Sequence, residues 1–381
     1  MEVQNVLILG ENSRRAIIGA LRIFAGDPRV RLHFGVAGLS FSKRALLRNF
    51  PEVSVAFLDF SSPESFVSSL VDLASVIGSY TLLPSEEYWL RIILANREVL
   101  NEKGIRVRCP EAAIYERVSN KGSFAELCLK HGLEVPRDCH FPESFSFPFV
   151  VKAHKLEKSA NVLEFPFLVE NQKAFKLLQK MSIDPSKHFC QQLIIGPSYY
   201  YCAFYERGEV LLSISQINLC QEPGGKSVIK ARPASLPDEI TGQIDSIFAN
   251  LEWDGVMMFE IKQDLSTDKF YAIECNPRLW GPSMLCIDNG VDIFSPLCYL
   301  PPKELGKPGM RIGYLWNAGY MEGFFTGMKL NSRFQRFREP ATLPSVRYKS
   351  VWWRKDTFVY AIAETMTVVL KGLRCMFAGK P

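Results

Sequence analysis

Two neighbouring stretches decide the fold, Gly255-Val-Met-Met-Phe-Glu-Ile-Lys-Gln-Asp264 and Phe270-Tyr-Ala-Ile-Glu-Cys-Asn-Pro-Arg278. Each has the apolar and aromatic composition of a buried strand, and the polar segment between them predicts a reversal of the chain. In an antiparallel pair closed there, Glu260 lies across from Glu274. Because side chains alternate between the faces of a strand, Glu274 and Asn276 lie on the same face.

The oxygen atoms of Glu260, Glu274 and Asn276 predict a magnesium site. Mg²⁺ prefers oxygen ligands and keeps water and phosphate oxygens in its other positions, so three such side chains suit an ion bound to a polyphosphate. Arg278 follows at once, and its planar fork suits a phosphoryl group or a carboxylate. The alternative is that both glutamates lie on the solvated face of a hairpin. Both follow apolar runs, Val-Met-Met-Phe and Tyr-Ala-Ile, which favours the metal site.

The first 110 residues predict a parallel α/β sheet. Apolar runs at 3–9, 31–37 and 74–83 read as strands, and helical patterns alternate with them, one of them over 86–100. The first turn reads Gly-Glu-Asn-Ser-Arg-Arg. It lacks the second and third glycines of the G-x-G-x-x-G pattern, so no dinucleotide site is expected there.

The segments after Cys109-Pro110 predict a helix and then a compact α+β unit. The helix opens at Asn120-Lys121 and ends at His131-Gly132, because glycine is a natural stop. The α+β unit has strands at 147–152, 165–169 and 189–195 and a helix over 172–181. Strands dominate afterwards, at 198–205, 210–216, 255–263 and 270–275.

Composition places the chain among folded globular proteins of two or three domains. It has 381 residues, of which 47% are hydrophobic and 22% charged, which excludes a disordered or low-complexity chain. The ten cysteines form no C-x-x-C pair and the five histidines show no metal-binding spacing, which fits a reducing compartment. Neither a secretory leader nor an apolar segment long enough to span a bilayer is apparent, so we expect a cytoplasmic protein.

The net charge of +5 is unevenly distributed. Residues 328–381 hold eleven Lys and Arg against three acids, a net charge of +8, so the first 327 residues sum to −3. A basic tail on a slightly acidic body argues against a nucleic-acid binder, whose cations would form a long stripe. The tail contains Val351-Trp-Trp-Arg-Lys355 and predicts a helix over 357–376 with Asp356 as its N-cap. Two roles stay open: packing against the body, and an interfacial helix in peripheral contact with anionic lipid.

The run Glu274-Cys-Asn-Pro-Arg278, followed by Gly281 and preceded by an acid on the previous strand, resembles the ATP-grasp superfamily of ligases. The resemblance covers roughly residues 75–300, and Leu83-Pro-Ser-Glu-Glu87 is similar to the carbamoyl-phosphate-synthase-like branch. It implies an N-terminal parallel-sheet pre-grasp domain over 1–110 and a two-lobed ATP-grasp fold over 111–327, with a lid at about 137–190. A helical and basic C-terminal extension, 328–381, completes the chain.

The resemblance also assigns residues to ATP. Lys121 and Lys152 look like the two phosphate lysines, and the hinge that holds adenine is Gln191, Gln192, Leu193 and Ile194. Glu260, Glu274 and Asn276 look like the ligands of Mg²⁺ or Mn²⁺, with Arg278 and Lys152 as catalytic cations. The segment holding Lys226, Lys230 and Arg232 follows a glycine pair and would face an anionic substrate. The alternative for that segment is a solvated turn.

The implied activity is that of a carboxylate–amine ligase. ATP phosphorylates a substrate carboxylate, and an amine then displaces phosphate to form an amide, so ATP and two small molecules are the expected partners and no nucleic acid is. Two departures weigh against this reading: residues 153–160 contain no glycine where the family has a glycine-rich lid loop, and Gly196-Pro-Ser-Tyr199 lacks the acid expected after the hinge. The alternative is therefore a nucleotide-binding regulatory or interaction protein with a degenerate lid.

Overall fold

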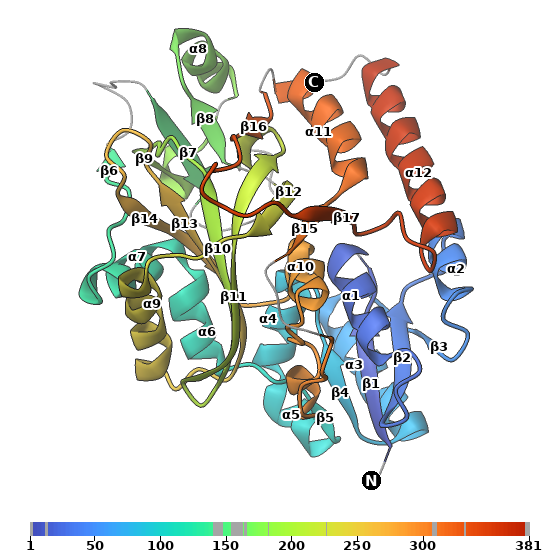
Figure 1. Ribbon diagram of the computed structural model, residues 1–381. Helices are drawn as coiled ribbons and strands as arrows, with labels where there is room; N and C mark the ends of the chain where they lie inside the picture. Colours follow the sequence, from blue (N-terminus) through green and yellow to red (C-terminus); the bar gives the residue numbers. More distant parts are fainter. Residues whose placement is uncertain are drawn as a thin grey trace.

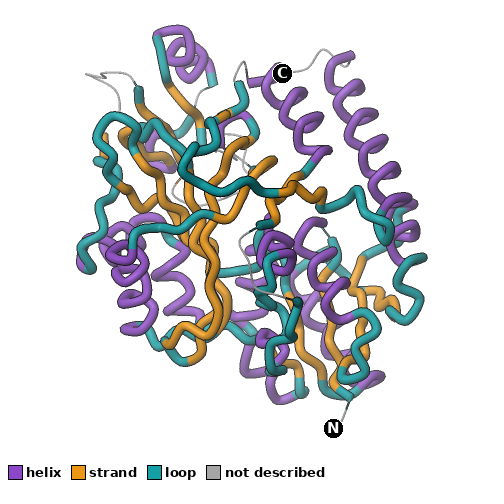
Figure 2. Tube along the Cα trace, viewed as in Figure 1, coloured by secondary structure: helices purple, strands orange, loops and turns teal. Residues whose placement is uncertain are grey.

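A computed structural model describes residues 3–11, 14–139, 148–153, 163, 166–181, 183–225, 227–306, 311–330 and 333–377. Their strands form a five-stranded, an eight-stranded and a four-stranded sheet. Figure 1 shows the five-stranded sheet at the lower right, the four-stranded sheet at the upper left and the eight-stranded sheet between them. Figure 2 shows helices against each of these layers. The parallel N-terminal sheet, the antiparallel sheets and the C-terminal helix confirm the predicted mixed fold class.

The five-stranded sheet is parallel, in the order β3-β2-β1-β4-β5. Its central strand is buried on both faces, because Val6 and Ile8 belong to one apolar cluster and Leu7 and Leu9 to another. The strands are β1 (Gln4–Leu9), β2 (Val30–Val36), β3 (Ser54–Phe57), β4 (Tyr80–Leu83) and β5 (Ile105–Arg106). The helices are α1 (Arg14–Phe24), α2 (Phe41–Leu47), α3 (Pro63–Ile77), α4 (Glu87–Ala95) and α5 (Arg97–Glu102).

Two sequence predictions in this region are wrong. The apolar run 74–83 is a strand only from Tyr80, because α3 continues to Ile77 and ends at Gly78, whose φ of 80° suits glycine. The helix expected over 86–100 is two helices. Asn96 leaves the helical region at φ −114°, ψ 19° and donates its side-chain amide to the Ile92 carbonyl. Apolar periodicity marked the burial of these segments but not the single residues that end them.

Two helices lead from the first sheet to the four-stranded sheet. They are α6 (Ala112–Ser119) and α7 (Lys121–Lys130). The predicted start of α7 is confirmed, because Asn120 Oδ1 accepts from the backbone N–H groups of Gly122 and Ser123. The sheet is antiparallel in the order β6-β9-β7-β8. Its elements are β6 (Asp138–Cys139), β7 (Phe149–Ala153), β8 (Phe167–Val169), α8 (Gln172–Lys180) and β9 (His188–Gln192).

The eight-stranded sheet has the path β14-β13-β10-β11-β12-β15-β17, with β16 paired to β11. Its two faces differ. Tyr201, Phe259 and Ile261 pack in a cluster with residues of α6, α7 and α9, while Tyr200 and Met258 point to the other face. The elements are β10 (Ser198–Glu206), β11 (Glu209–Gln221), β12 (Val228–Pro233), α9 (Asp238–Asn250), β13 (Gly255–Gln263), β14 (Phe270–Asn276), α10 (Met284–Asp288) and β15 (Ile312–Leu315).

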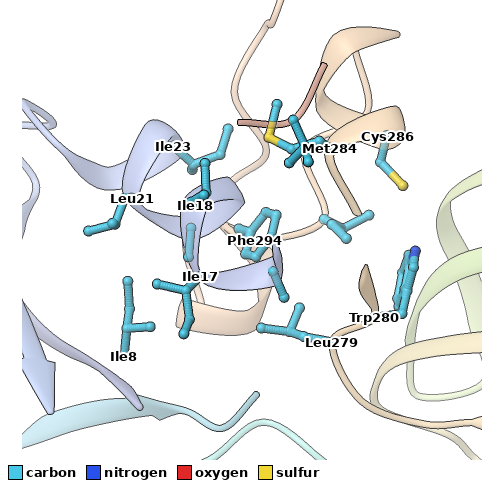
Figure 3. Close-up of a cluster of buried hydrophobic side chains, with 14 of the residues drawn as sticks. Ile8, Ile17, Ile18, Leu21, Ile23, Leu279, Trp280, Met284, Cys286 and Phe294 are labelled. Atoms are coloured by element: carbon cyan, nitrogen blue, oxygen red, sulfur yellow. The ribbon is translucent and has the colours of Figure 1, made fainter. Parts of the chain in front are cut away.

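Helix α1 joins the first sheet to the end of β14. Figure 3 shows Ile17, Ile18 and Leu21 of α1 in one apolar cluster with Leu279 and Phe294. All five side chains are at most 3% exposed. Burial on this scale is worth about 1.5–3 kcal/mol for each large apolar side chain. The N-terminal sheet is therefore fixed against the segment that follows Arg278.

The C-terminal extension packs against the eight-stranded sheet and against helix α1 of the N-terminal part. Its elements are β16 (Gln335–Arg336), β17 (Arg347–Ser350) and α12 (Phe358–Phe377), preceded by α11 (Asn317–Leu330). Strand β17 pairs in parallel with β15. Arg22 of α1 donates hydrogen bonds to both carboxylate oxygens of Asp356. Packing against the body, one of the two predicted roles, is thus confirmed.

Asp356 is not the N-cap of the last helix. Helix α12 begins at Phe358, so the cap position falls to Thr357, whose carbonyl accepts from the N–H of Ala361. The carboxylate of Asp356 is instead taken by Arg22. Among the described residues, no helix is both long enough and apolar enough to cross a membrane.

Candidate ATP and metal site

Glu260 and Glu274 face each other on neighbouring strands. They are direct partners in the antiparallel register of β13 and β14, and Met258 is the partner of Asn276. The Asn276 side-chain amide donates to Glu274 Oε1 at 2.8 Å, so these two residues share a face. The strand pairing and the alternation inferred from the sequence are confirmed. The role of the three side chains as metal ligands remains a prediction.

The environment of Glu260 is unfavourable for a bare carboxylate. The side chain is buried, and burial together with the charge of Glu274 raises the pKa of Glu260 to about 7. Ser198 Oγ donates to Glu260 Oε1 at 2.6 Å, which partly offsets both effects. A cation held by the two carboxylates would relieve the same repulsion.

The donor set fits Mg²⁺. Two carboxylates and the side-chain carbonyl of Asn276 are all hard oxygen ligands. Three protein ligands leave the other coordination positions of Mg²⁺ for water or phosphate. No group of three or more His, Cys, Asp and Glu capable of holding a metal occurs within the described ranges. The predicted ligand set is compatible with that finding, because it contains only two acids, and its third ligand is an amide.

Lys152 of the four-stranded sheet lies near enough to the two carboxylates to be influenced by their charge. It lies on β7 and is 8% exposed, and its Nζ donates to Gln191 Oε1 at 3.2 Å. Burial lowers the pKa of Lys152, while the charges of Glu274 and Glu260 act to raise it. The ammonium group is therefore within electrostatic range of both glutamates.

Lys121 approaches from a third element, the first turn of α7. Its Nζ donates to the Ala153 carbonyl at 3.0 Å and lies 5.7 Å from the centre of the Phe189 ring. Burial lowers the pKa of Lys121 to about 8, with Glu274 opposing that shift and Lys152 adding to it. Two lysines and two glutamates that are distant in sequence thus meet in one place.

Arg278 connects this site to the N-terminal sheet. One of its terminal nitrogens donates to Asn276 Oδ1 at 3.0 Å and the other to the Leu279 carbonyl at 3.2 Å. Its Nε lies 3.8 Å from a carboxylate oxygen of Glu87, the first residue of α4. The sequence placed Arg278 beside the predicted metal ligands, and it did not single out Glu87 as its ionic partner.

The predicted hinge runs along the end of β9. Gln191 and Gln192 are the last residues of the strand, and Leu193 and Ile194 follow. Gln191 bridges two groups, since its Nε2 donates to Asp138 Oδ1 at 3.1 Å and its Oε1 accepts from Lys152. The strand expected to continue to Ile195 ends at Gln192. The backbone after it therefore leaves the sheet.

Gly196 holds the hinge against the β13–β14 turn. A Cβ there would lie 1.7 Å from the Gln263 carbonyl oxygen. The N–H of Leu265 donates to the Ile195 carbonyl at 3.0 Å, and that of Gln263 to the Pro197 carbonyl at 3.2 Å. Only glycine permits this approach.

The predicted substrate cations are bound to the C-terminal extension. Lys230 Nζ donates to Glu339 Oε1 at 2.8 Å and lies 4.1 Å from the centre of the Tyr348 ring. Arg232 donates to Glu339 Oε2 at 3.3 Å. Lys226 falls outside the described residues. A substrate role for Lys230 and Arg232 stays a prediction.

A polar row beside the glutamates was missed at the sequence level. Across the sheet, Glu274 pairs with Glu260, Glu260 with Tyr200, and Tyr200 with Gln216. Gln216 and Asn218 are at most 1% exposed, and in the described part of the chain Gln216 Oε1 and Asn218 Nδ2 have no hydrogen-bond partner. The signal was present, because Gln216 and Asn218 alternate with apolar residues in a buried strand.

Arg15 was also missed. Its guanidinium stacks 3.9 Å from the centre of the Trp316 ring and donates to the Val228 carbonyl at 3.0 Å and to Tyr314 Oη at 3.3 Å. A Cβ on Gly281 would lie 2.6 Å from the Arg15 guanidinium carbon. The Arg15 side chain therefore extends from α1 to β12 and β15. These segments are far apart in the sequence, so no local pattern predicts their contact.

The fold is similar to those of several solved structures. An L-amino acid ligase from Bacillus licheniformis is 17% identical with a TM-score of 0.56, over 77% of this chain and 73% of that chain. A biotin carboxylase from Campylobacter jejuni in its beta-gamma-ATP complex is 15% identical with a TM-score of 0.57, over 81% of this chain and 73% of that chain. The biotin carboxylase domain of the Hydrogenobacter thermophilus 2-oxoglutarate carboxylase, with MgADP and bicarbonate, is 13% identical with a TM-score of 0.57. The match covers 77% of this chain and 68% of that chain.

These similarities lie in the structure and not in the sequence. No protein-family model matches the chain, and no curated protein shows significant similarity to it. At identities of 17% or less, the structural neighbours establish the architecture. That architecture is the one the E-x-N-P-R run indicated: the chain has the ATP-grasp fold.

Proposed function

We propose that the chain is an ATP-dependent ligase that joins a carboxylate to an amine and releases ADP and phosphate. The observation that carries this proposal is the convergence of Lys121, Lys152, Glu260 and Glu274 from α7, β7, β13 and β14. Two cations beside two acids suit a triphosphate bound together with a divalent ion, because each charge then has an opposite partner.

Each residue has a distinct task in this proposal. Lys121 and Lys152 neutralise phosphate oxygens as point charges, and Arg278 steadies the transferring phosphoryl group or the substrate carboxylate. Residues 191–194 offer side-chain amides and backbone groups to adenine. Glu260, Glu274 and Asn276 would hold Mg²⁺ or Mn²⁺, which supplies charge neutralisation on the phosphates.

The proposed reaction needs no nucleophile from the protein. A carboxylate oxygen of the substrate attacks the γ-phosphorus of ATP, and the bond to ADP breaks. The amine then attacks the carbonyl carbon of the acyl phosphate, loses a proton and expels phosphate. The protein's part is to position the two substrates and stabilise charge. The unpartnered Oε1 of Gln216 and Nδ2 of Asn218 lie two strands from Glu260, where a polar substrate would meet them.

The comparisons support the proposal through what the neighbours do. One is a ligase of amino acids, and another was solved with MgADP and bicarbonate. By analogy, we divide this chain into a pre-grasp part over 1–110, a grasp part over 111–327 that carries the lid, and an extension over 328–381. The substrates of the neighbours are not assigned to this chain.

A second candidate is a protein that binds the nucleotide without turning it over. Residues 153–160 contain no glycine to cradle phosphates through the backbone, and Ser198 binds Glu260 where the family places an acid near the ribose. A binder of this kind would act as a regulatory or interaction module.

A substrate-pool screen tests the two candidates. The protein is incubated with ATP, Mg²⁺ and mixed amino acids and other small carboxylates and amines, and ADP is measured together with any product whose mass equals two pool members minus water. A ligase gives both signals, and omitting the amines abolishes the product. ATP binding without ADP in every pool would favour the binder and contradict the proposal.

A further inference from the structure

The last helix has an apolar side that faces solvent. Its inner side packs against α2 and α11, which flank it in Figure 1. Tyr360, Ala361 and Val368 are buried there, and a Cβ on Gly372 would collide with the ring of Phe325. The inner side therefore already has its partners, and the apolar residues on the outer side are not needed for that packing.

The outer side of α12 forms a continuous apolar stripe. Phe358, Ile362, Met366, Leu370 and Leu373 recur at spacings of four, four, four and three residues, which aligns them along one face. They are between 36% and 59% exposed. Val359 lies within the same third of the helix circumference and is 47% exposed. Single exposed apolar side chains are ordinary, but an aligned set of six marks a contact surface.

An aromatic residue extends the stripe at its N-terminal end. Trp353 is 38% exposed, and its ring packs edge-on against Phe358 with centroids 5.6 Å apart. Phe41, the first residue of α2, is 75% exposed on the helix that packs beside α12. Tryptophan with one face on protein and one in solvent is enriched where proteins meet the polar–apolar boundary of a bilayer.

The charges around the stripe are cationic. Asp356 is bound by Arg22, and Glu364 is 4% exposed, so the acids of this segment are turned away from solvent or paired. Lys355 is exposed just before α12, and Arg44 and Arg48 are exposed at α2, which contains no acid and packs beside α12. The surface thus combines an apolar line with a positive border.

We propose that this surface, Trp353 with the outer side of α12 and its cationic border, docks onto an anionic lipid bilayer. The helix would lie in the headgroup region with its apolar line toward the acyl chains. The border would be attracted to anionic headgroups, by about fivefold in affinity for each cation near the surface. Docking onto a second copy of the chain is disfavoured, because a two-fold contact would bring the cations of one copy close to those of the other.

The decisive experiment is co-sedimentation of the full chain with vesicles. One set contains equal parts of phosphatidylserine and phosphatidylcholine, and the other contains phosphatidylcholine alone. Removing residues after 328 would also take β17 from the sheet, so point substitutions on exposed positions are used. The test variant carries Ile362→Gln, Met366→Gln and Leu370→Gln, since glutamine keeps the helix and removes the apolar line.

A matched control carries Val76→Gln, Val99→Gln and Leu129→Gln. These are also exposed apolar positions on helices, on α3, α5 and α7, away from α12. We expect the wild type and the control to bind the anionic vesicles and the test variant to lose at least tenfold in partitioning. Replacing Arg44, Arg48 and Lys355 by glutamine in the wild type should weaken binding and remove most of its salt dependence.

Three results would overturn the proposal. The first is equal sedimentation with and without phosphatidylserine. The second is a test variant that binds like the control. The third is no vesicle binding but a concentration-dependent dimer in analytical ultracentrifugation that the test variant abolishes, which would assign the surface to a second copy.

Discussion

Substituting Gly196 by alanine should separate the hinge from the β13–β14 turn. The new Cβ would sit 1.7 Å from the Gln263 carbonyl oxygen, and ordinary contact begins at 3.4 Å, so the two backbones must part by about 1.7 Å. That movement breaks the bonds from Leu265 N to the Ile195 carbonyl and from Gln263 N to the Pro197 carbonyl. At about 1 kcal/mol for each bond and about 1–3 kcal/mol for overpacking, the loss of folding free energy is about 3 kcal/mol or more.

Urea unfolding followed by fluorescence and circular dichroism measures this effect. The matched control is Gly242→Ala in α9, where an added Cβ meets nothing within 4 Å. That substitution should stabilise the chain by about 0.5–1 kcal/mol, because alanine costs less backbone entropy in a helix than glycine. ATP affinity should also fall in Gly196→Ala, since the displaced hinge is the proposed adenine contact. An unfolding midpoint of Gly196→Ala at or above that of the wild type would refute the reasoning.

Two further predictions concern the N-terminal part and its link to the tail. Asp27 is bound by Arg29 and Lys303, and these cations hold the pKa of its carboxyl well below the usual range, so its contribution to stability is present above about pH 4 and is lost as the pH falls. The stability difference between the wild type and Asp27→Asn should therefore shrink from neutral pH to about pH 3 in urea titrations, and a difference that stays constant would contradict the assignment. Arg22 binds Asp356, Thr357 and the Val351 carbonyl, so Arg22→Met should destabilise the chain by about 2–4 kcal/mol and expose α12 to proteolysis. Arg48→Gln, at an exposed position, serves as its control, and equal digestion rates for the two variants would show that the link does not hold the tail.

The core of the candidate site could be predicted from sequence because it is local. Glu260, Glu274 and Asn276 lie on one hairpin, so period-2 alternation and a single turn are enough to bring them together. The bounds of β13 were predicted as found, and the start of α7 followed from Asn120, whose side chain caps the helix within three residues. Lys121 and Lys152 joined the site only through a resemblance, since nothing local places α7 and β7 beside the hairpin.

What sequence reasoning missed depends on long-range contacts or on single residues. Arg15 contacts Trp316 and Tyr314 from the other end of the chain. Glu87, at the start of α4, lies beside Arg278, which follows β14. The tail was expected to carry a helix, but not the strand β17, which pairs in parallel with β15. Parallel strands are not joined by a short turn, so no turn sequence predicts this pairing. Gly78 and Asn96 ended helices at points where apolar periodicity continued. Lys230 and Arg232 looked like free cations until Glu339, more than a hundred residues away, was seen to bind them.

ATP turnover in Glu274→Gln tests the proposed site most directly. The substitution keeps the shape of the side chain and removes one of the two facing carboxylates, and Glu209→Gln, at an exposed position in β11, controls for the loss of an acid. ADP release by the wild type is measured with ATP, Mg²⁺ and the carboxylate and amine pool, alongside circular dichroism of each variant. We predict that Glu274→Gln folds normally and loses at least about a hundredfold in ADP release, while Glu209→Gln retains wild-type release. Wild-type ADP release from a folded Glu274→Gln would contradict the assignment of this site.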